Sequence, residues 1–146
     1  MQNRAKNKAI EYVKAIRKEN KWLGEMDELV EKIDASPSIA VAYNYVIRLS
    51  VYQVNLGQLV AKLVRRSNAA YAYRKYKYAD EWTSLSMAGN KRDMEAEKLI
   101  YDNRVDEIAV RYVADMLKAK HDDISGLIMA VQSGARIEDR DRFTAR

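Results

Sequence analysis

Residues 37–63 read PSIAVAYNYVIRLSVYQVNLGQLVAKL and decide the fold class. Apolar side chains recur in this stretch at alternating spacings of three and four residues, which is typical of an α-helix with one buried face. The repeat consists of Ile39, Ala42, Val46, Leu49, Gln53, Leu56, Val60 and Leu63, and Gln53 is its polar member. Further apolar residues lie on other sides of the same helix. We therefore expect it to be buried on more than one side, as in packing between subunits.

The same spacing before and after this stretch predicts further long helices. The expected elements are a helix over about 3–33, a helix over about 37–79, a loop over about 80–90, a helix over about 91–133 and a short C-terminal tail over 134–146. Seams of this kind with few connecting residues predict an all-α fold. We expect a single helical domain over 1–146 that forms a helical bundle or antiparallel coiled coil and assembles into a homo-oligomer.

A few residues mark where we expect these helices to bend, begin or end. Gly24 is a point at which the first helix could bend or split. Ser36 and Pro37 suit the N-cap and the first position of the second helix, where the N–H that proline lacks is not needed. Gly134 is a natural C-terminal stop for the last helix. Residues 121–123 could break that helix, but the seam passes through them without a change of phase, which favours one helix.

The composition excludes several classes of protein. With 5 glycines and 1 proline in 146 residues, the chain has few of the turn residues that sheets and loop-rich folds need. It contains no cysteine, which excludes disulfides, thiolate metal sites and cysteine nucleophiles. No apolar run approaches the ~20 residues that span a bilayer, and the polar start is not followed by an apolar leader region. We therefore expect a cytoplasmic protein.

Sequence patterns of catalysis and metal binding are absent. The chain has no Gly-rich phosphate loop, no G-x-S-x-G and no H-E-x-x-H. His121 is the single histidine and stands beside Asp122 and Asp123, but neighbouring residues on a helix point about 100° apart. The acidic residues of the last helix alternate with Lys and Arg, as on a solvated helix face. We expect no enzyme, no catalytic residue, no metal site and no cofactor.

The positive charge of the chain is concentrated in one segment. The net charge is +5. Residues 1–34 carry 8 Lys and Arg against 7 Asp and Glu, residues 35–79 carry 7 against 0, and residues 80–146 carry 11 against 14. An excess of cations in one segment is typical of a protein that binds a polyanion.

Seven of the ten tyrosines lie in the same acid-free segment. Proteins hold single-stranded nucleic acid with cations that contact phosphates and with aromatic rings on which unpaired bases stack. A helix-turn-helix pattern for reading a duplex is absent. The sequence therefore predicts a nucleic-acid-binding surface that consists of Lys62, Arg65, Arg66, Tyr71, Tyr73, Arg74, Lys75, Tyr76, Lys77 and Tyr78.

Three other interpretations of these residues stay open. The tyrosines could pack inside the bundle without a ligand, with Tyr71 and Tyr78, seven residues apart, in one packed row. Tyr and Arg are also favoured anchors of protein interfaces, which would suit a helical protein-interaction module. Basic amphipathic helices can bind anionic lipid, but no compact Trp or Phe face lies beside these cations, so we expect no membrane partner.

The second part of the chain resembles a known family. It contains a basic stretch that ends in aromatics at Lys62–Tyr78, a polar loop at Ser84–Asn90 and a long helix at Tyr101–Val131. The tail reads IEDRDRFTA over residues 137–145. From Lys62 onward this arrangement is similar to the UvsY-type recombination mediators of T-even-like phages.

The resemblance implies a small helical protein that forms a ring-like homo-oligomer, binds single-stranded DNA and helps to load a recombinase onto strands covered by single-strand-binding protein. It also implies that Lys62, Arg65 and Arg66 form the family's basic motif and that Tyr76 and Tyr78 are its aromatics. We thus predict a single-stranded-DNA-binding recombination mediator of the host cytoplasm. The alternative is a protein-interaction module, such as a phage accessory or inhibitor protein, with no nucleic-acid binding.

Overall fold

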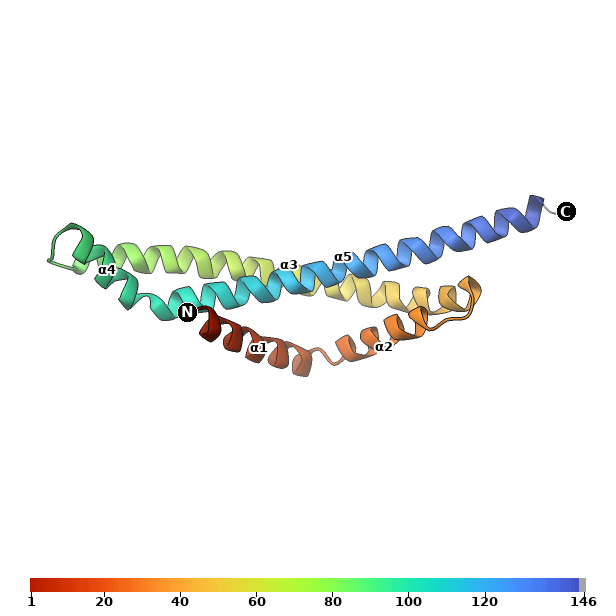
Figure 1. Ribbon diagram of the computed structural model, residues 1–146, viewed down its shortest axis with the longest axis horizontal. Helices are drawn as coiled ribbons and strands as arrows, with labels where there is room; N and C mark the ends of the chain where they lie inside the picture. The colour runs from red at the N-terminus through yellow and green to blue at the C-terminus, as the bar shows by residue number, and fades with distance from the viewer. Residues whose placement is uncertain (145–146) are drawn as a thin grey trace. The chain divides into compact units, whose positions relative to one another are not determined.

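The chain folds into α-helices. The computed structural model describes the backbone of residues 1–144 and the side chains of all of these except 136–139, 142 and 143. Over these residues it contains five helices and no strand. They are α1 (Gln2–Glu19), α2 (Trp22–Asp34), α3 (Ile39–Ser84), α4 (Gly89–Leu99) and α5 (Tyr101–Thr144) (Figure 1). The predicted all-α class is confirmed.

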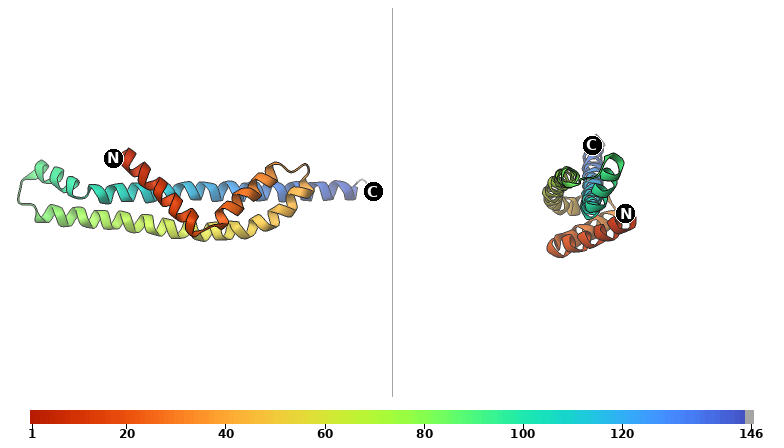
Figure 2. Two further views of the ribbon diagram at one scale, coloured as in Figure 1. Left: turned by 90° about the horizontal axis from the view of Figure 1, so that it is seen from below. Right: turned by 90° about the vertical axis from the view of Figure 1, so that its left-hand side faces the viewer.

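The helices form two compact units. Unit 1 comprises Met1–Ala15 and Val60–Met116, and unit 2 comprises Ile16–Leu59 and Leu117–Arg146. α3 and α5 each supply one segment to each unit, and within a unit the two segments run antiparallel. Most of α1 together with α4 completes unit 1, and α2 completes unit 2 (Figure 2). Each unit is therefore a small helical bundle.

The α3 seam is buried in unit 2. Ala42, Val46, Leu49 and Leu56 are at most 5% exposed. The rest of this core consists of Leu23, Met26, Leu29 and Ile33 of α2 and Leu117, Ile124 and Ile128 of α5. Gln53, the polar member of the seam, donates a hydrogen bond from Nε2 to Ser125 Oγ of α5 at 2.6 Å. Its amide is thus satisfied inside the bundle, as a buried polar group requires.

The core of unit 1 is made largely of small side chains. Its buried apolar residues are Ala5, Ala9, Leu63, Ala96, Ile100, Val105, Ala109, Val110, Val113 and Ala114. Only two of these, Ala5 and Ala9, belong to α1. The apolar area that α1 buries in this core is therefore small, and other contacts must hold it in place.

The first predicted helix is in fact two helices. α1 ends at Glu19 and α2 begins at Trp22. Asn20 Nδ2 donates to the carbonyl oxygen of Ile16 at 3.0 Å, a side-chain bond that competes with continuation of the helix. Gly24, where a bend was expected, lies inside α2.

The second predicted helix begins later than expected. Ser38 rather than Ser36 is its N-cap, because Ser38 Oγ accepts a hydrogen bond from the N–H of Val41 at 3.3 Å and α3 starts at Ile39. Ser36 Oγ instead donates to the carbonyl oxygen of Lys32 at 2.6 Å, in the last turn of α2.

This helix also ends later, so the predicted loop over 80–90 is too long. α3 continues to Ser84 and α4 begins at Gly89. Arg92 closes the turn, since its Nε donates to the carbonyl oxygen of Trp82 at 2.5 Å and its Nη2 to that of Thr83 at 3.3 Å. These bonds satisfy carbonyls that the end of a helix leaves without partners.

The helix predicted over 91–133 differs at both ends. It is divided at Ile100, a fully buried residue whose φ of −100° and ψ of 9° bend the backbone between α4 and α5. α5 passes through residues 121–123 without a break, as expected, and also through Gly134 to Thr144. The prediction of a helix stop and a tail from residue 134 is therefore wrong up to Thr144, and residues 145–146 lie outside the described residues.

Gly134 has a packing role instead. A Cβ atom at this position would lie 2.8 Å from Ile39 Cδ1 of α3. Because real carbon atoms do not approach so closely, glycine lets the two helices of unit 2 pack tightly at this point. A glycine in the sequence can mark either a close contact between helices or the end of a helix, which explains the wrong prediction.

A stripe of apolar side chains remains exposed on α3 in unit 2. Tyr43, Ile47, Val51 and Val54 are 40%, 60%, 63% and 61% exposed and follow each other at spacings of three or four residues. From the sequence we expected α3 to be buried on a second side. Within the described chain, no other element covers this stripe. Among the described residues, no helix has the length and apolar character needed to cross a membrane.

Two glycines of α5 should respond differently to alanine. Gly126→Ala, with nothing near the new Cβ, should raise the free energy of unfolding by about 0.5–1 kcal/mol, because alanine loses less backbone entropy. Gly134→Ala should raise the free energy of unfolding by less, because the new methyl group would lie too close to Ile39. Adding Ile39→Val, which removes Cδ1, should make the effect of Gly134→Ala more favourable. Urea unfolding of the single and double variants measures these differences, and equal gains at both glycines would contradict the packing role.

Candidate nucleic-acid interface

All ten residues of the predicted surface lie on α3 within unit 1. Unit 1 also holds the net charge of the chain. It contains 15 Lys and Arg against 10 Asp and Glu, a balance of +5, whereas unit 2 contains 11 of each. A polyanion is therefore attracted to unit 1.

Two of the ten residues face the bundle. Arg74 Nε donates to Glu107 Oε2 of α5 at 2.6 Å, and the side chains are only 15% and 11% exposed. The hydrogen bond with Glu107 raises the pKa of Arg74. The Tyr78 hydroxyl donates to Asp93 Oδ1 of α4 at 3.0 Å, and this bond raises the pKa of Tyr78 above its ordinary value of 10.0. Both side chains are engaged in contacts between helices.

Six of the remaining residues share one face of α3. An α-helix turns by about 100° per residue, so these six positions fall within an arc of about 120°. They form what we call the basic row, which consists of Lys62, Arg65, Arg66, Tyr73, Tyr76 and Lys77. Tyr73 and Tyr76 are 52% and 65% exposed, and both rings are therefore open to a ligand.

The last two residues lie on a different side of the helix. Tyr71 and Lys75 are one turn apart and point well away from the basic row. Tyr71 is exposed. The guanidinium carbon of Arg74 lies 5.2 Å from the centroid of the Tyr71 ring, and the ammonium nitrogen of Lys75 lies 5.4 Å from it. The ten residues predicted as one surface are thus divided between two sides of α3, with the basic row on one side and Tyr71, Arg74, Lys75 and Tyr78 on the other.

Arg66 connects the basic row to α1. Its guanidinium carbon lies 5.0 Å from the centroid of the Tyr12 ring. The Tyr12 hydroxyl donates to Asp106 Oδ1 of α5, and Lys8 Nζ lies 3.1 Å from the same oxygen. A chain of four side chains therefore joins α3, α1 and α5 within unit 1.

The charges of this chain shift one another's pKa values. Partial burial by itself would raise the pKa of Asp106, but the hydrogen bonds from Tyr12 and Lys8 outweigh it and lower the pKa below its ordinary value of 3.8. Burial and the hydrogen bond to Asp106 raise the pKa of Tyr12. Burial would lower the pKa of Lys8, but its contact with Asp106 raises it overall. The carboxylate of Asp106 is therefore the anion that holds this group together.

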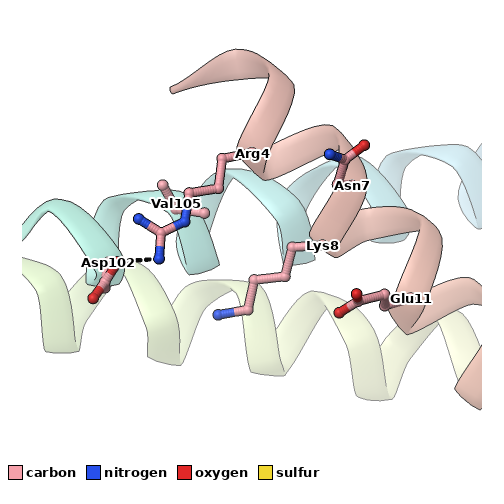
Figure 3. A pocket seen from close by; sticks show the side chains of 6 residues that line it. All are labelled: Arg4, Asn7, Lys8, Glu11, Asp102 and Val105. Atoms are coloured by element: carbon pink, nitrogen blue, oxygen red, sulfur yellow. Dashed lines mark ion pairs between the residues drawn. The ribbon is translucent and has the colours of Figure 1, made fainter.

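A cleft lies between α1 and α5 beside these residues. It has a volume of about 430 Å³ and is lined by Arg4, Asn7, Lys8, Glu11, Asp102 and Val105 (Figure 3). Arg4 Nη2 lies 3.1 Å from Asp102 Oδ1. The α1 side of the cleft thus presents two cations and the carboxylate of Glu11, and the α5 side presents the carboxylate of Asp102 to Arg4.

The site predicted from the sequence does not include α1. Counting residues 1–34 together hides that the first 15 residues carry 4 Lys and Arg against 1 Glu. Tyr12 falls in the apolar stripe of its helix, which made it look like a core residue. A charge count over shorter windows would have shown the basic start of α1, but its position next to α3 depends on contacts far apart in the sequence.

Replacing Arg74 should lower stability rather than remove a ligand contact. Arg74→Ala leaves Glu107 almost buried without its partner, so we expect the free energy of unfolding to fall by up to about 3 kcal/mol. Lys75→Ala, at the next and exposed position, should change it by no more than about 0.5 kcal/mol. Urea unfolding tests both variants. Equal stabilities for the two variants would contradict a bundle role for Arg74.

The Asp106 group should make stability depend on pH in the acidic range. A carboxylate with a lowered pKa stabilises the fold above its unfolded-state pKa, and this contribution is lost as the pH falls through the folded-state value. Asp106→Asn should therefore be less stable than the wild type at neutral pH, and the difference should shrink below about pH 4. Urea unfolding at several pH values measures it. A difference that stays constant down to about pH 3 would show that Asp106 does not act through its charge.

Comparison with protein-family models, with curated proteins and with solved structures gives no match to this chain. The resemblance to the UvsY-type mediators therefore stays a prediction from the residues.

Proposed function

We propose that this chain binds single-stranded nucleic acid along the basic row of α3. As the resemblance to the UvsY-type family implies, it would act as a single-stranded-DNA-binding recombination mediator that helps to load a recombinase. The observation that carries the proposal is the exposure of Tyr73 and Tyr76 on the same helix face as four cations. No acidic residue occurs on α3 before Asp80.

The dimensions of the basic row suit a short length of single strand. From Lys62 to Lys77 the helix rises by about 22 Å. Cations lie at both ends of the row and the two rings lie toward its C-terminal end. Phosphates would contact the cations, and each stacked base would contribute about 1–3 kcal/mol whatever its identity. Binding of this kind has little preference for sequence.

The structure changes the roles that we assign to the ten predicted residues. The six of the basic row are the proposed contacts, and among them Arg66 also contacts Tyr12. Tyr71 and Lys75, on another side of α3, are at most a separate contact. Arg74 and Tyr78 stabilise the bundle through Glu107 and Asp93.

Self-association would strengthen weak binding by a single row. The exposed stripe of Tyr43, Ile47, Val51 and Val54 is the surface that we propose for a homo-oligomer. Several rows on one strand bind with an avidity far above that of each row. A recombinase and a single-strand-binding protein would be the protein partners, as the resemblance implies.

The same stripe favours a second candidate function. An exposed apolar row on a helix is typical of protein interaction sites. The chain would then be a helical interaction module without nucleic-acid binding, and the tyrosines and arginines of α3 would add anchors for the protein partner. The two functions differ in whether the chain binds a nucleic acid at all.

Fluorescence anisotropy with labelled single-stranded and duplex DNA at several salt concentrations tests the proposal. We expect tighter binding to the single strand, because its bases are free to stack. The variant Lys62→Ala/Arg65→Ala/Lys77→Ala should reduce the dependence of log K on log salt concentration by about 2, or about 0.7 for each phosphate contact. Tyr76→Ala should weaken binding by about 1–3 kcal/mol without changing that slope, and Tyr76→Phe should retain most of the affinity.

The matched control removes three exposed cations from unit 2. Lys18→Ala/Lys21→Ala/Lys118→Ala changes the net charge equally and should leave the slope unchanged. No binding by the wild type at low salt would exclude the proposed function and favour the interaction module. Equal slopes for the two triple variants would place the contact outside the basic row.

A further inference from the structure

Two ion pairs hold the start of α1 against α5. Arg4 Nη2 lies 3.1 Å from Asp102 Oδ1, with the side chains 62% and 78% exposed. Lys8 Nζ lies 3.1 Å from Asp106 Oδ1, with the side chains 39% and 36% exposed. The pair of Arg4 and Asp102 is thus the more exposed of the two. An exposed ion pair contributes little free energy, so a phosphate can compete with the Asp102 carboxylate for Arg4.

Arg4, Lys8 and Asp102 line a cleft in unit 1, the unit that also contains the basic row. α5 runs antiparallel to α3 in unit 1, and Arg74 pairs with Glu107. The turns of α5 that carry Asp102 and Asp106 therefore lie alongside the turns of α3 near Tyr73 and Lys77. Figure 3 shows Arg4 extending from α1 toward Asp102 of α5, with Lys8 on the same side of α1.

The two cations of α1 are suited to phosphate. An arginine guanidinium matches a phosphate in a bidentate arrangement, and a lysine adds a point charge. Arg66 of the basic row lies 5.0 Å from the centroid of the Tyr12 ring, and Tyr12 is one turn along α1 from Lys8. The basic row on α3 and the cations on α1 can thus contact the same strand.

We propose that the cleft between α1 and α5 is a phosphate-binding extension of the basic row, in which Arg4 exchanges the carboxylate of Asp102 for a phosphate of a single strand and Lys8, still paired with Asp106, adds a second cation. This inference rests on the proposed function. It assigns to α1 a binding role and to Asp102 the role of a competing anion.

This competition predicts the direction in which Asp102→Asn changes the affinity for a single strand. Asp102→Asn removes the anion that occupies Arg4, so it should tighten binding to a labelled oligo-dT by about two- to fivefold at low salt. An ion pair with a purely structural role predicts unchanged or weaker binding instead. In the background of Arg4→Gln the same substitution should give no gain, because the cation that it frees is absent.

The cations are tested with a charge-matched pair of double variants. Arg4→Gln/Lys8→Gln should lower the dependence of log K on log salt concentration by about 1.4, or about 0.7 for each lost phosphate contact. Lys6→Gln/Arg111→Gln removes two cations that do not line this cleft and should leave that slope unchanged. Circular dichroism and thermal unfolding show whether each variant retains the helical fold.

The outcomes separate this inference from the function on which it rests. If the wild type does not bind oligo-dT at all, the proposed function fails. If the wild type binds and the triple variant of the basic row is impaired, but Asp102→Asn does not tighten binding and the two double variants have equal slopes, only the inference about α1 is wrong. A gain from Asp102→Asn that persists with Arg4→Gln would show a general charge effect and would also overturn it.

Discussion

Arg74 of α3 and Glu107 of α5 form the contact that sets the register of the two helices in unit 1. The pair has two hydrogen bonds, Nε to Oε2 at 2.6 Å and Nη2 to Oε1 at 3.4 Å. Glu107 is only 8% exposed. Breaking a nearly buried pair leaves a charge without compensation, which disfavours alternative registers. A shift of α3 by one residue would rotate its side chains by about 100° and turn the basic row out of its present position.

The cations of unit 1 fall into groups that differ in their energetic setting. Arg74 is held in a nearly buried pair, and Arg92 donates to backbone carbonyls at the end of α3. Arg4 has an exposed carboxylate partner, whose attraction is weak in water, and Lys8 has a half-buried one. Lys62 and Arg65 are exposed on the basic row. The exposed cations can contact phosphates and release counterions from the nucleic acid, whereas Arg74 and Arg92 maintain the fold.

The sequence was enough to predict the parts of the fold that depend on local periodicity. The α3 seam from Ala42 to Leu63 is buried, and Gln53 in its midst finds a partner across the bundle, because a repeat of three and four residues places one face toward a core. The ends of helices were harder to predict. Asn20 ends α1 through a single side-chain bond to Ile16, a contact that apolar periodicity does not reveal.

Other features depend on contacts between residues far apart in the chain. The sequence alone suggests that Gly134 ends a helix, whereas its contact with Ile39 shows that it has a packing role. The sequence alone suggests that Arg74 is a free cation, whereas in the structure it pairs with Glu107, 33 residues later. The composition of the candidate site, cations and tyrosines without acids, was visible in the sequence. Which part of the site faces the bundle became visible only once the inward face of that helix was known.

The spacing of the two exposed rings bears on how a strand would be held. Cations alone attract duplex and single strand alike, so preference for a single strand has to come from stacking. Tyr73 and Tyr76 are three residues apart, which is a rise of about 4.5 Å. Both rings are exposed, so each can stack with a base. A duplex has no unstacked base to place there, so the two tyrosines favour the single strand.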